Sequence, residues 1–206
     1  MDGVVRHDGS ARDAQEVVTR DGFGARTAKN ILDAIVHEGV QRRRFDRRAV
    51  STKIDALAPY LWGVDGTEVS VAGSFRRRRE TIGDVDLLVG ATSAARVVDW
   101  FTRYSAFKRV TVRGFVRATA YLEDDLQVDL RVVQSHIYGA ALLYFTGSKV
   151  HNIDLRRIAR TKGLKLNEYG LFRGNRMIAG ATEQSIYRGL HLRWVPPADR
   201  EGIEEL

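Results

Sequence analysis

The sequence contains no cysteine and no long apolar run. The absence of cysteine excludes disulfide bonds, thiol catalysis and zinc sites built on cysteine ligands. No stretch approaches the roughly 20 apolar residues that span a bilayer, and the N-terminus has no apolar core of a signal peptide. Internal repeats and low-complexity segments are also missing. We therefore expect an intracellular protein that does not interact with membranes.

What is present describes an ordinary globular chain with an excess of positive charge. Of 206 residues, 44% are hydrophobic and 29% are charged, so the chain can bury a core as one domain or two small ones. Lys and Arg total 33 against 26 Asp and Glu, giving a net charge of +7. Because the excess is mostly arginine, it favours a phosphate-rich partner such as nucleic acid, although many proteins are basic without such a partner.

The hydrophobic pattern predicts an α+β fold rather than a doubly wound α/β fold. Helical spacing marks an N-terminal helix over residues 28–36, while the arginine-rich residues 41–48 look like a linker or an exposed edge. Strands then come in a run with few crossovers, followed by a smaller α/β module that ends at Pro196-Pro197. Further helices are expected at 50–61, 93–104, 135–145, 150–161 and 182–190, and strands at 68–72, 84–89, 107–112, 115–121, 126–133, 165–166 and 177–179.

Residues 73–86 combine a Gly-Ser turn, four consecutive arginines and two aspartates one residue apart. If residues 84–89 form a strand, alternation places Asp84 and Asp86 on one face and apolar side chains on the other. Two such carboxylates repel each other unless a cation lies between them, and a hard divalent ion suits their oxygens. The turn and the arginines add donors for a phosphate. Together they predict phosphoryl or nucleotidyl transfer, whereas an aspartate pair alone is more often a surface feature.

A third aspartate lies in an otherwise apolar strand. Alternation places Gln127, Asp129 and Arg131 on one face of residues 126–133. If this strand lies beside residues 84–89, the three aspartates converge as a ligand set for two magnesium ions. The alternative is that Arg131 is simply a structural salt-bridge partner.

Four segments of the chain resemble family X DNA polymerases, the polymerase beta superfamily. They occur in the family's order and roughly its spacing, and the similarity runs from about Gly22 to Arg200. The segments are residues 73–77 with 80–86, 128–131, 144–148 and 166–170. The resemblance implies a nucleotidyltransferase palm at residues 46–135, made of a mixed sheet with flanking helices, a small α/β thumb at 136–206, and a helical remnant of fingers at 1–45.

The resemblance also implies a role for each matching position. Asp84 and Asp86 would hold both metal ions (Mg²⁺, with Mn²⁺ able to substitute). Asp129 would hold only the catalytic ion and help to deprotonate the primer 3′-hydroxyl. The implied contacts with the incoming nucleotide are Gly73, Ser74, Arg77 and Gly83 for its phosphates, Tyr144, Phe145 and Gly147 for its sugar, and Asn152 for the nascent base pair.

The resemblance implies contacts with DNA as well. Arg156 would meet the template strand, and Glu168 and Tyr169 would position the thumb. Arg131 would pair with Asp86 in the open state and leave it on closing. Gly22 and Gly24 resemble a helix-hairpin-helix turn that points amides at a phosphate, but an ordinary helix start fits equally well. Arg78 stands where the family often has glycine, so a turn with positive φ would cost about 1 kcal/mol there.

We therefore expect a template-directed DNA polymerase that fills short gaps in DNA repair, acting on gapped or primer-template DNA with dNTPs. We expect a monomer in the cytoplasm, associated with the nucleoid. Because few residues precede the palm and no nuclease motif follows it, no lyase activity and no associated nuclease are expected. Two alternatives stay open: a template-independent nucleotidyltransferase acting on DNA or RNA ends, and a non-catalytic module that binds DNA ends.

Overall fold

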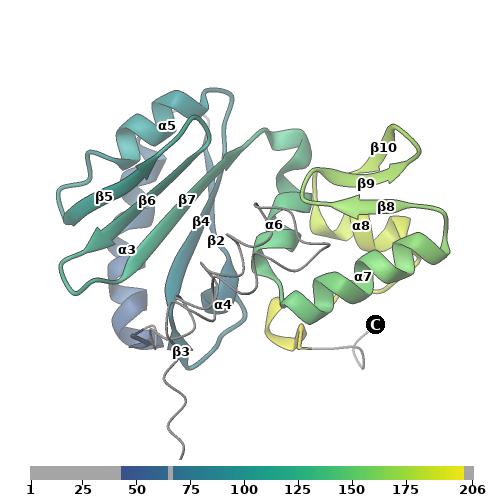
Figure 1. The fold of residues 1–206 in the computed structure, drawn as a ribbon, viewed down its shortest axis with the longest axis horizontal. Coiled ribbons are helices and arrows are strands. Elements are labelled where there is room, and N and C mark those ends of the chain that lie inside the picture. The colour runs from purple at the N-terminus through teal and green to yellow at the C-terminus, as the bar shows by residue number, and fades with distance from the viewer. Residues whose placement is uncertain (1–42, 65–66, 202–206) are drawn as a thin grey trace, which may run out of the picture. The chain divides into compact units, whose positions relative to one another are not determined.

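The computed structural model of the chain describes residues 43–64 and 67–201 (Figure 1). The helix expected at residues 28–36 and the hairpin at Gly22 and Gly24 lie outside these described residues. None of the helices within the described ranges is long and apolar enough to cross a membrane.

A five-stranded mixed sheet carries most of the first half of the described chain. Its strand order is β2 (Glu68–Val71), β4 (Asp84–Gly90), β7 (Gln127–Val133), β6 (Arg117–Leu122) and β5 (Phe107–Arg113). Strands β4 and β7 are parallel, and the other pairs are antiparallel. The predicted α+β fold is confirmed, since the run of strands forms a single sheet with helices beside it.

Two helices cover one face of this sheet, behind it in Figure 1. They are α3 (Arg47–Trp62) and α5 (Ala94–Phe101), whose apolar stripes meet the inward positions of β4 and β7. Asp46 begins α3 by accepting a hydrogen bond from the Arg48 amide at 2.8 Å. The core between helices and sheet includes Val50, Leu57, Leu61, Val97, Phe101, Val85, Leu87, Val128 and Leu130. Alternation along β4 and β7 therefore leaves the aspartates on the opposite face.

The second half of the described chain has its own core. Helices α6 (Tyr138–Thr146), α7 (Lys149–Thr161) and α8 (Glu183–Gly189) pack with an antiparallel sheet of β8 (Lys165–Asn167), β9 (Gly170–Arg173) and β10 (Arg176–Ala179). Ser148 and Thr182 cap the starts of α7 and α8. Gly139 lets α6 approach α8 closely, because a Cβ there would overlap the Thr182 backbone. A smaller cluster, with Leu88 of β4 and Tyr138 of α6, joins the two halves.

Several local expectations are wrong. Residues 45–46, expected in a linker or an exposed edge, form a short strand β1 (Phe45–Asp46) that pairs with β3 (Thr81–Ile82), and neither strand was predicted. The expected Gly73-Ser74 turn is instead the short helix α4 (Gly73–Arg76). Strand β9 was not predicted, and Phe115 lies in the β5–β6 turn with 92% of its surface exposed. The structured part also continues past Pro196-Pro197, through a 3₁₀ turn at Pro197–Asp199 to the fully buried Arg200.

Candidate active site

Three carboxylates share the face of the sheet that α3 and α5 leave uncovered. The parallel register of β4 and β7 places Asp86 directly beside Asp129, and Asp84 beside Gln127. The structure thus brings together the three aspartates expected to form the site. Their donor set, six carboxylate oxygens, fits a hard divalent cation. Within the described residues, however, no group of three or more His, Asp or Glu side chains is arranged so that it could hold a metal ion.

The electrostatics of this cluster show a deficit of positive charge. Burial, and then the neighbouring negative charges of Asp84 and Asp129, raise the pKa of Asp86 to about 7. Arg77 and Arg131 oppose the shift but do not cancel it. Within the described chain no ion pair joins Arg131 to Asp86, so the pairing expected for an open state is not seen here. A cation beside Asp86 would stabilise its ionised form.

Helix α4 begins directly against Asp86. Gly73 has a φ of 59°, and a Cβ at this position would overlap the Asp86 carboxylate. The Ala72 amide donates to the Asp86 carbonyl oxygen at 2.8 Å, which joins β2 to β4 just before the helix. Glycine is therefore required both by the backbone conformation and by the carboxylate. Ser74 and Gly83, expected at the nucleotide phosphates, are both partly buried. Arg78 has a φ of 60°, which is the positive φ considered above for this position.

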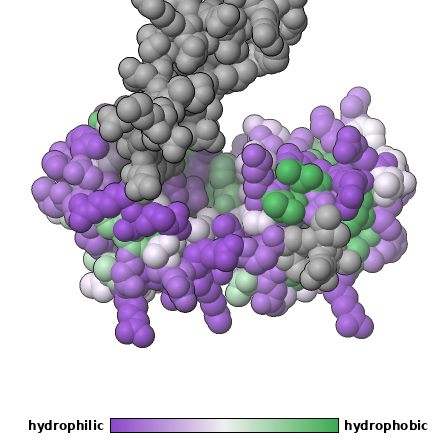
Figure 2. Space-filling model, turned by 60° about the horizontal axis from the view of Figure 1, so that its bottom comes forward, coloured by the Kyte–Doolittle hydropathy of each residue, from purple (hydrophilic) through white to green (hydrophobic). Residues whose placement is uncertain are grey.

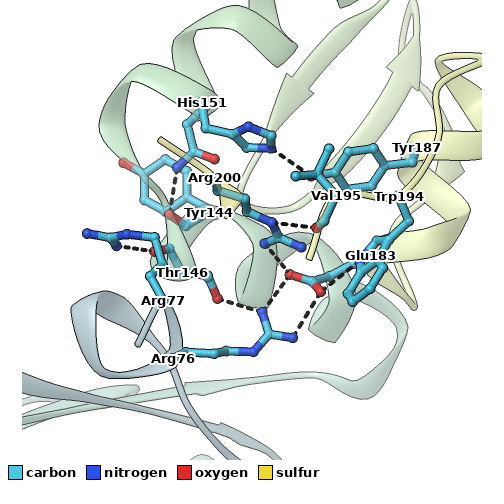
Figure 3. Close-up of polar contacts among 11 residues, drawn as sticks. Arg76, Arg77, Tyr144, Thr146, His151, Glu183, Tyr187, Trp194, Val195 and Arg200 are labelled. Carbon is cyan, nitrogen blue, oxygen red and sulfur yellow. Dashed lines mark hydrogen bonds and ion pairs between the residues drawn. The ribbon is translucent and has the colours of Figure 1, made fainter. Parts of the chain in front are cut away.

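The arginines of α4 and its end contact the second half of the chain (Figure 3). Arg76 donates to both oxygens of Glu183, at 2.8 and 3.0 Å, and to the Thr146 hydroxyl at 2.8 Å. Arg200 donates to the same Glu183 carboxylate at 2.7 Å. Arg77 is the residue expected at the nucleotide phosphates. One of its guanidinium N–H groups donates a hydrogen bond to the Thr146 carbonyl oxygen at 2.5 Å. Its Nε is buried without a hydrogen-bond partner.

This buried network of Arg76, Glu183 and Arg200 was not predicted. Arg76 stood in a recognised segment without a role, and Glu183 looked like any acidic residue in the first turn of a helix. Arg200 lay beyond the expected end of the structured part. Burial works to raise the pKa of Glu183, but the hydrogen bonds from Arg76 and Arg200 outweigh it and lower the pKa to about 2.

The end of α6 places the residues expected around the sugar. Tyr144 and Phe145 contact each other edge to face, with ring centroids 5.2 Å apart, and the Arg131 guanidinium lies 5.3 Å from the Phe145 ring centre. Gly147 follows with a φ of 72° and has the Arg77 guanidinium beside it. Asn152, expected at the nascent base pair, donates its side-chain amide to the Tyr144 carbonyl oxygen at 2.7 Å.

Two cavities meet at Arg131 and Phe145. The first, about 280 Å³, extends from the carboxylates along the sheet and is lined in part by Asp86, Asp129, Thr119, Arg117, Arg131 and Phe145. The second, about 890 Å³, is lined in part by Arg131, Tyr144, Phe145, Glu168, Tyr169 and His136. Glu168 and Tyr169, expected to position the thumb, thus share a cavity with Arg131.

A basic surface lies along α7 and β8. Arg156 and Arg160 line one further cavity with Lys165, and Arg156 Nε donates to the Asn152 carbonyl oxygen at 3.1 Å. Hydrophilic side chains predominate on the described part of the face shown in Figure 2. A basic surface suits a polyanionic partner, because each phosphate that it neutralises releases counterions.

Comparison with known proteins gives two family matches. Residues 44–160 match the DNA polymerase beta palm, and residues 141–201 match the DNA polymerase beta thumb. The DNA polymerase/3′-5′ exonuclease PolX of Bacillus subtilis is 30% identical over 203 residues, covering 95% of this chain and 35% of that protein. DNA polymerase lambda of Arabidopsis thaliana is 26% identical over 171 residues, covering 66% of this chain and 32% of that protein.

A shorter match is the human DNA-directed DNA/RNA polymerase mu, 41% identical over 78 residues, which cover 36% of this chain and 16% of that protein. The chain thus spans about a third of the length of the first two of these relatives.

Proposed function

Because the chain belongs to the DNA polymerase beta family, family X of the DNA polymerases, we propose that it is a DNA-directed DNA polymerase. Residues 46–135 act as the palm and residues 136–206 as the thumb. The substrates are a primer-template or a gapped duplex and a dNTP, and the task is short-gap filling in repair. The protein acts as a monomer in the cytoplasm, at the nucleoid.

One observation carries the proposal: the register of β4 and β7 puts Asp86 beside Asp129, and the pKa of Asp86 rises to about 7 among carboxylates. A charge cluster of this kind destabilises a fold, and such clusters are typical of functional sites. Asp84, Asp86 and Asp129 would hold Mg²⁺, or Mn²⁺ in its place. When bound, the metal supplies Lewis acidity, lowering the pKa of the attacking hydroxyl and neutralising phosphate charge.

The reaction joins the primer 3′-oxygen to the α-phosphorus of the dNTP and breaks the bond from that phosphorus to the bridging oxygen, which leaves with pyrophosphate. Asp129 takes part in removing the proton of the 3′-hydroxyl. Arg77, Ser74 and the amides at Gly73 and Gly83 bind the phosphates. Because Arg77 is tied to the Thr146 carbonyl oxygen in this structure, nucleotide binding exchanges that hydrogen bond for a phosphate.

The sugar and base contacts come from α6 and α7. Tyr144, Phe145 and Gly147 line the sugar pocket. Asn152 reaches the nascent base pair after it leaves the Tyr144 carbonyl oxygen, and Arg156 meets the template strand. Glu168 and Tyr169, which line the same cavity as Arg131, position the thumb. Gly22 and Gly24 are further candidates for contacts with DNA.

The test uses a labelled primer at a one-nucleotide gap, each dNTP singly, and Mg²⁺ or Mn²⁺. Incorporation of only the complementary nucleotide, lost in Asp129→Asn, supports the proposal, and Asp99→Asn on the exposed side of α5 is the matched control. Equal addition of all four nucleotides, or extension of a bare single strand, identifies a template-independent nucleotidyltransferase. Gap binding without any extension identifies a non-catalytic module. Light scattering of the purified protein measures its mass and so tests whether it is a monomer.

A further inference from the structure

The carboxylate of Asp129 is held by two neutral donors. The Thr119 hydroxyl donates to Oδ1 at 2.5 Å, and the Gln127 side-chain amide donates to Oδ2 at 2.6 Å. Each oxygen keeps a further lone pair, so both donors leave room for another ligand. Thr119 approaches from β6, on the opposite side of β7 from Asp86. The two hydrogen bonds thus fix the direction of the carboxylate without blocking its side toward Asp86.

The strand register explains why these donors reach Asp129. Thr119 on β6 lies directly opposite Asp129 on β7, and Tyr121 lies directly opposite Gln127. The next strand continues the second row, because Arg109 on β5 pairs with Tyr121. Two polar rows therefore cross the sheet side by side, and Gln127 links them by reaching from its own row to Asp129.

The orientation of the Gln127 amide is set from the same row. The Tyr121 hydroxyl donates to Gln127 Oε1 at 2.9 Å, which leaves the Gln127 nitrogen to face Asp129. The Arg109 guanidinium lies 3.9 Å from the centre of the Tyr121 ring and is itself held by Asp125 at 2.7 Å. The chain of contacts from Arg109 to Asp129 is thus continuous, with each group fixing the next.

The hydrogen-bonded side chains around Asp129 are only partly buried, namely those of Thr119, Tyr121, Gln127 and Asp129 itself. Water therefore competes for their hydrogen bonds, and these bonds contribute little to the stability of the fold. Oriented carboxylates, by contrast, matter greatly where they must meet a metal ion or a reacting proton. We propose that Gln127 and Thr119 are positioning residues for Asp129 in nucleotidyl transfer, and that Tyr121 sets the amide orientation of Gln127. The inference rests on the proposed function, and it assigns these three residues a role that composition and motif do not.

The test compares Gln127→Leu, Thr119→Val, Thr119→Ser and Tyr121→Phe with the parent chain. Two matched controls are Thr52→Val, exposed on α3, and Tyr104→Phe, which packs on the opposite side of the sheet. Single-nucleotide gap filling gives kcat and the KM for the dNTP. Electron paramagnetic resonance gives the affinity of the DNA-free protein for Mn²⁺ alone.

We expect Gln127→Leu and Thr119→Val each to lower kcat, and to weaken Mn²⁺ binding, by about 10- to 100-fold. The KM for the dNTP changes by less than about threefold, because the nucleotide is bound elsewhere. Thr119→Ser, which keeps the hydroxyl, retains the parent values. Tyr121→Phe has a smaller effect than Gln127→Leu, because the amide keeps its donor but loses its fixed orientation.

The inference is overturned if Gln127→Leu and Thr119→Val stay within about twofold of the parent in both kcat and Mn²⁺ affinity. It is also overturned if the loss appears in the KM alone. Should either variant fail to fold, Tyr121→Phe decides the question by a milder change, with Thr119→Ser as the variant expected to match the parent. If the parent chain extends no primer, the proposed function fails, whereas the Mn²⁺ affinities still decide whether these residues position Asp129.

Discussion

Replacing Glu183 by glutamine removes the single negative charge that joins Arg76 to Arg200. The side chain of Glu183 is 3% exposed and that of Arg200 is fully buried, so water cannot compensate for the lost charge. The pKa of Glu183 falls from 4.5 to about 2 on folding, which corresponds to roughly 3 kcal/mol of stabilisation at neutral pH. We therefore expect Glu183→Gln to lower the free energy of unfolding by about 3 kcal/mol at pH 7.

The stabilisation that the ionised Glu183 gives to the fold depends on pH. A carboxyl group whose pKa is depressed by folding stabilises the protein fully above its unfolded pKa, here 4.5, and loses that effect as pH falls toward about 2. The difference between the parent and Glu183→Gln should therefore be constant from pH 7 to 5 and shrink below pH 4.5. Other carboxyl groups titrate alike in both proteins, so the difference isolates Glu183.

Urea unfolding followed by circular dichroism measures this difference, with Glu123→Gln in the exposed β6–β7 turn as the matched control. We expect that control to change the free energy of unfolding by less than about 0.5 kcal/mol. The reasoning would be refuted if Glu183→Gln cost less than about 1 kcal/mol at pH 7, or if its cost did not shrink between pH 4.5 and pH 3.

Three further predictions concern the active face and the thumb. Without a divalent cation, Asp86→Asn should raise the free energy of unfolding by a few kcal/mol above pH 7. The reason is that a carboxyl with a raised pKa loses its stabilising effect as pH rises from 3.8 through about 7. Urea unfolding measures this difference, and an equal gain in the free energy of unfolding at pH 4 would contradict it. Gly73→Ala should abolish gap filling, because its Cβ displaces the Asp86 carboxylate, and should cost about 1–2 kcal/mol in stability; normal kcat would contradict this. Tyr187→Phe removes the 2.6 Å hydrogen bond between Tyr187 and the buried His151 and should lower the free energy of unfolding by about 1–3 kcal/mol in the same urea assay.

The sheet and its carboxylate face could be predicted because they depend on local alternation. Strands β4 and β7 carry apolar residues at every second position, and burying these residues turns Asp84, Asp86 and Asp129 to the other face whatever the neighbouring strands do. Helices α3 and α5 were predicted for the same reason, since a helical period of apolar residues marks the side that packs. The short strands β1 and β3 were missed because two residues hold no periodic signal.

The sequence by itself determined the family and the sheet face that carries the three aspartates. The tertiary structure alone decided which side chains meet: Arg76 and Arg200 on Glu183, and Thr119 and Gln127 on Asp129. The physical reason is that these contacts depend on strand register and on the packing of distant helices. A hydrogen bond between residues 107 positions apart leaves no periodic trace in either local sequence.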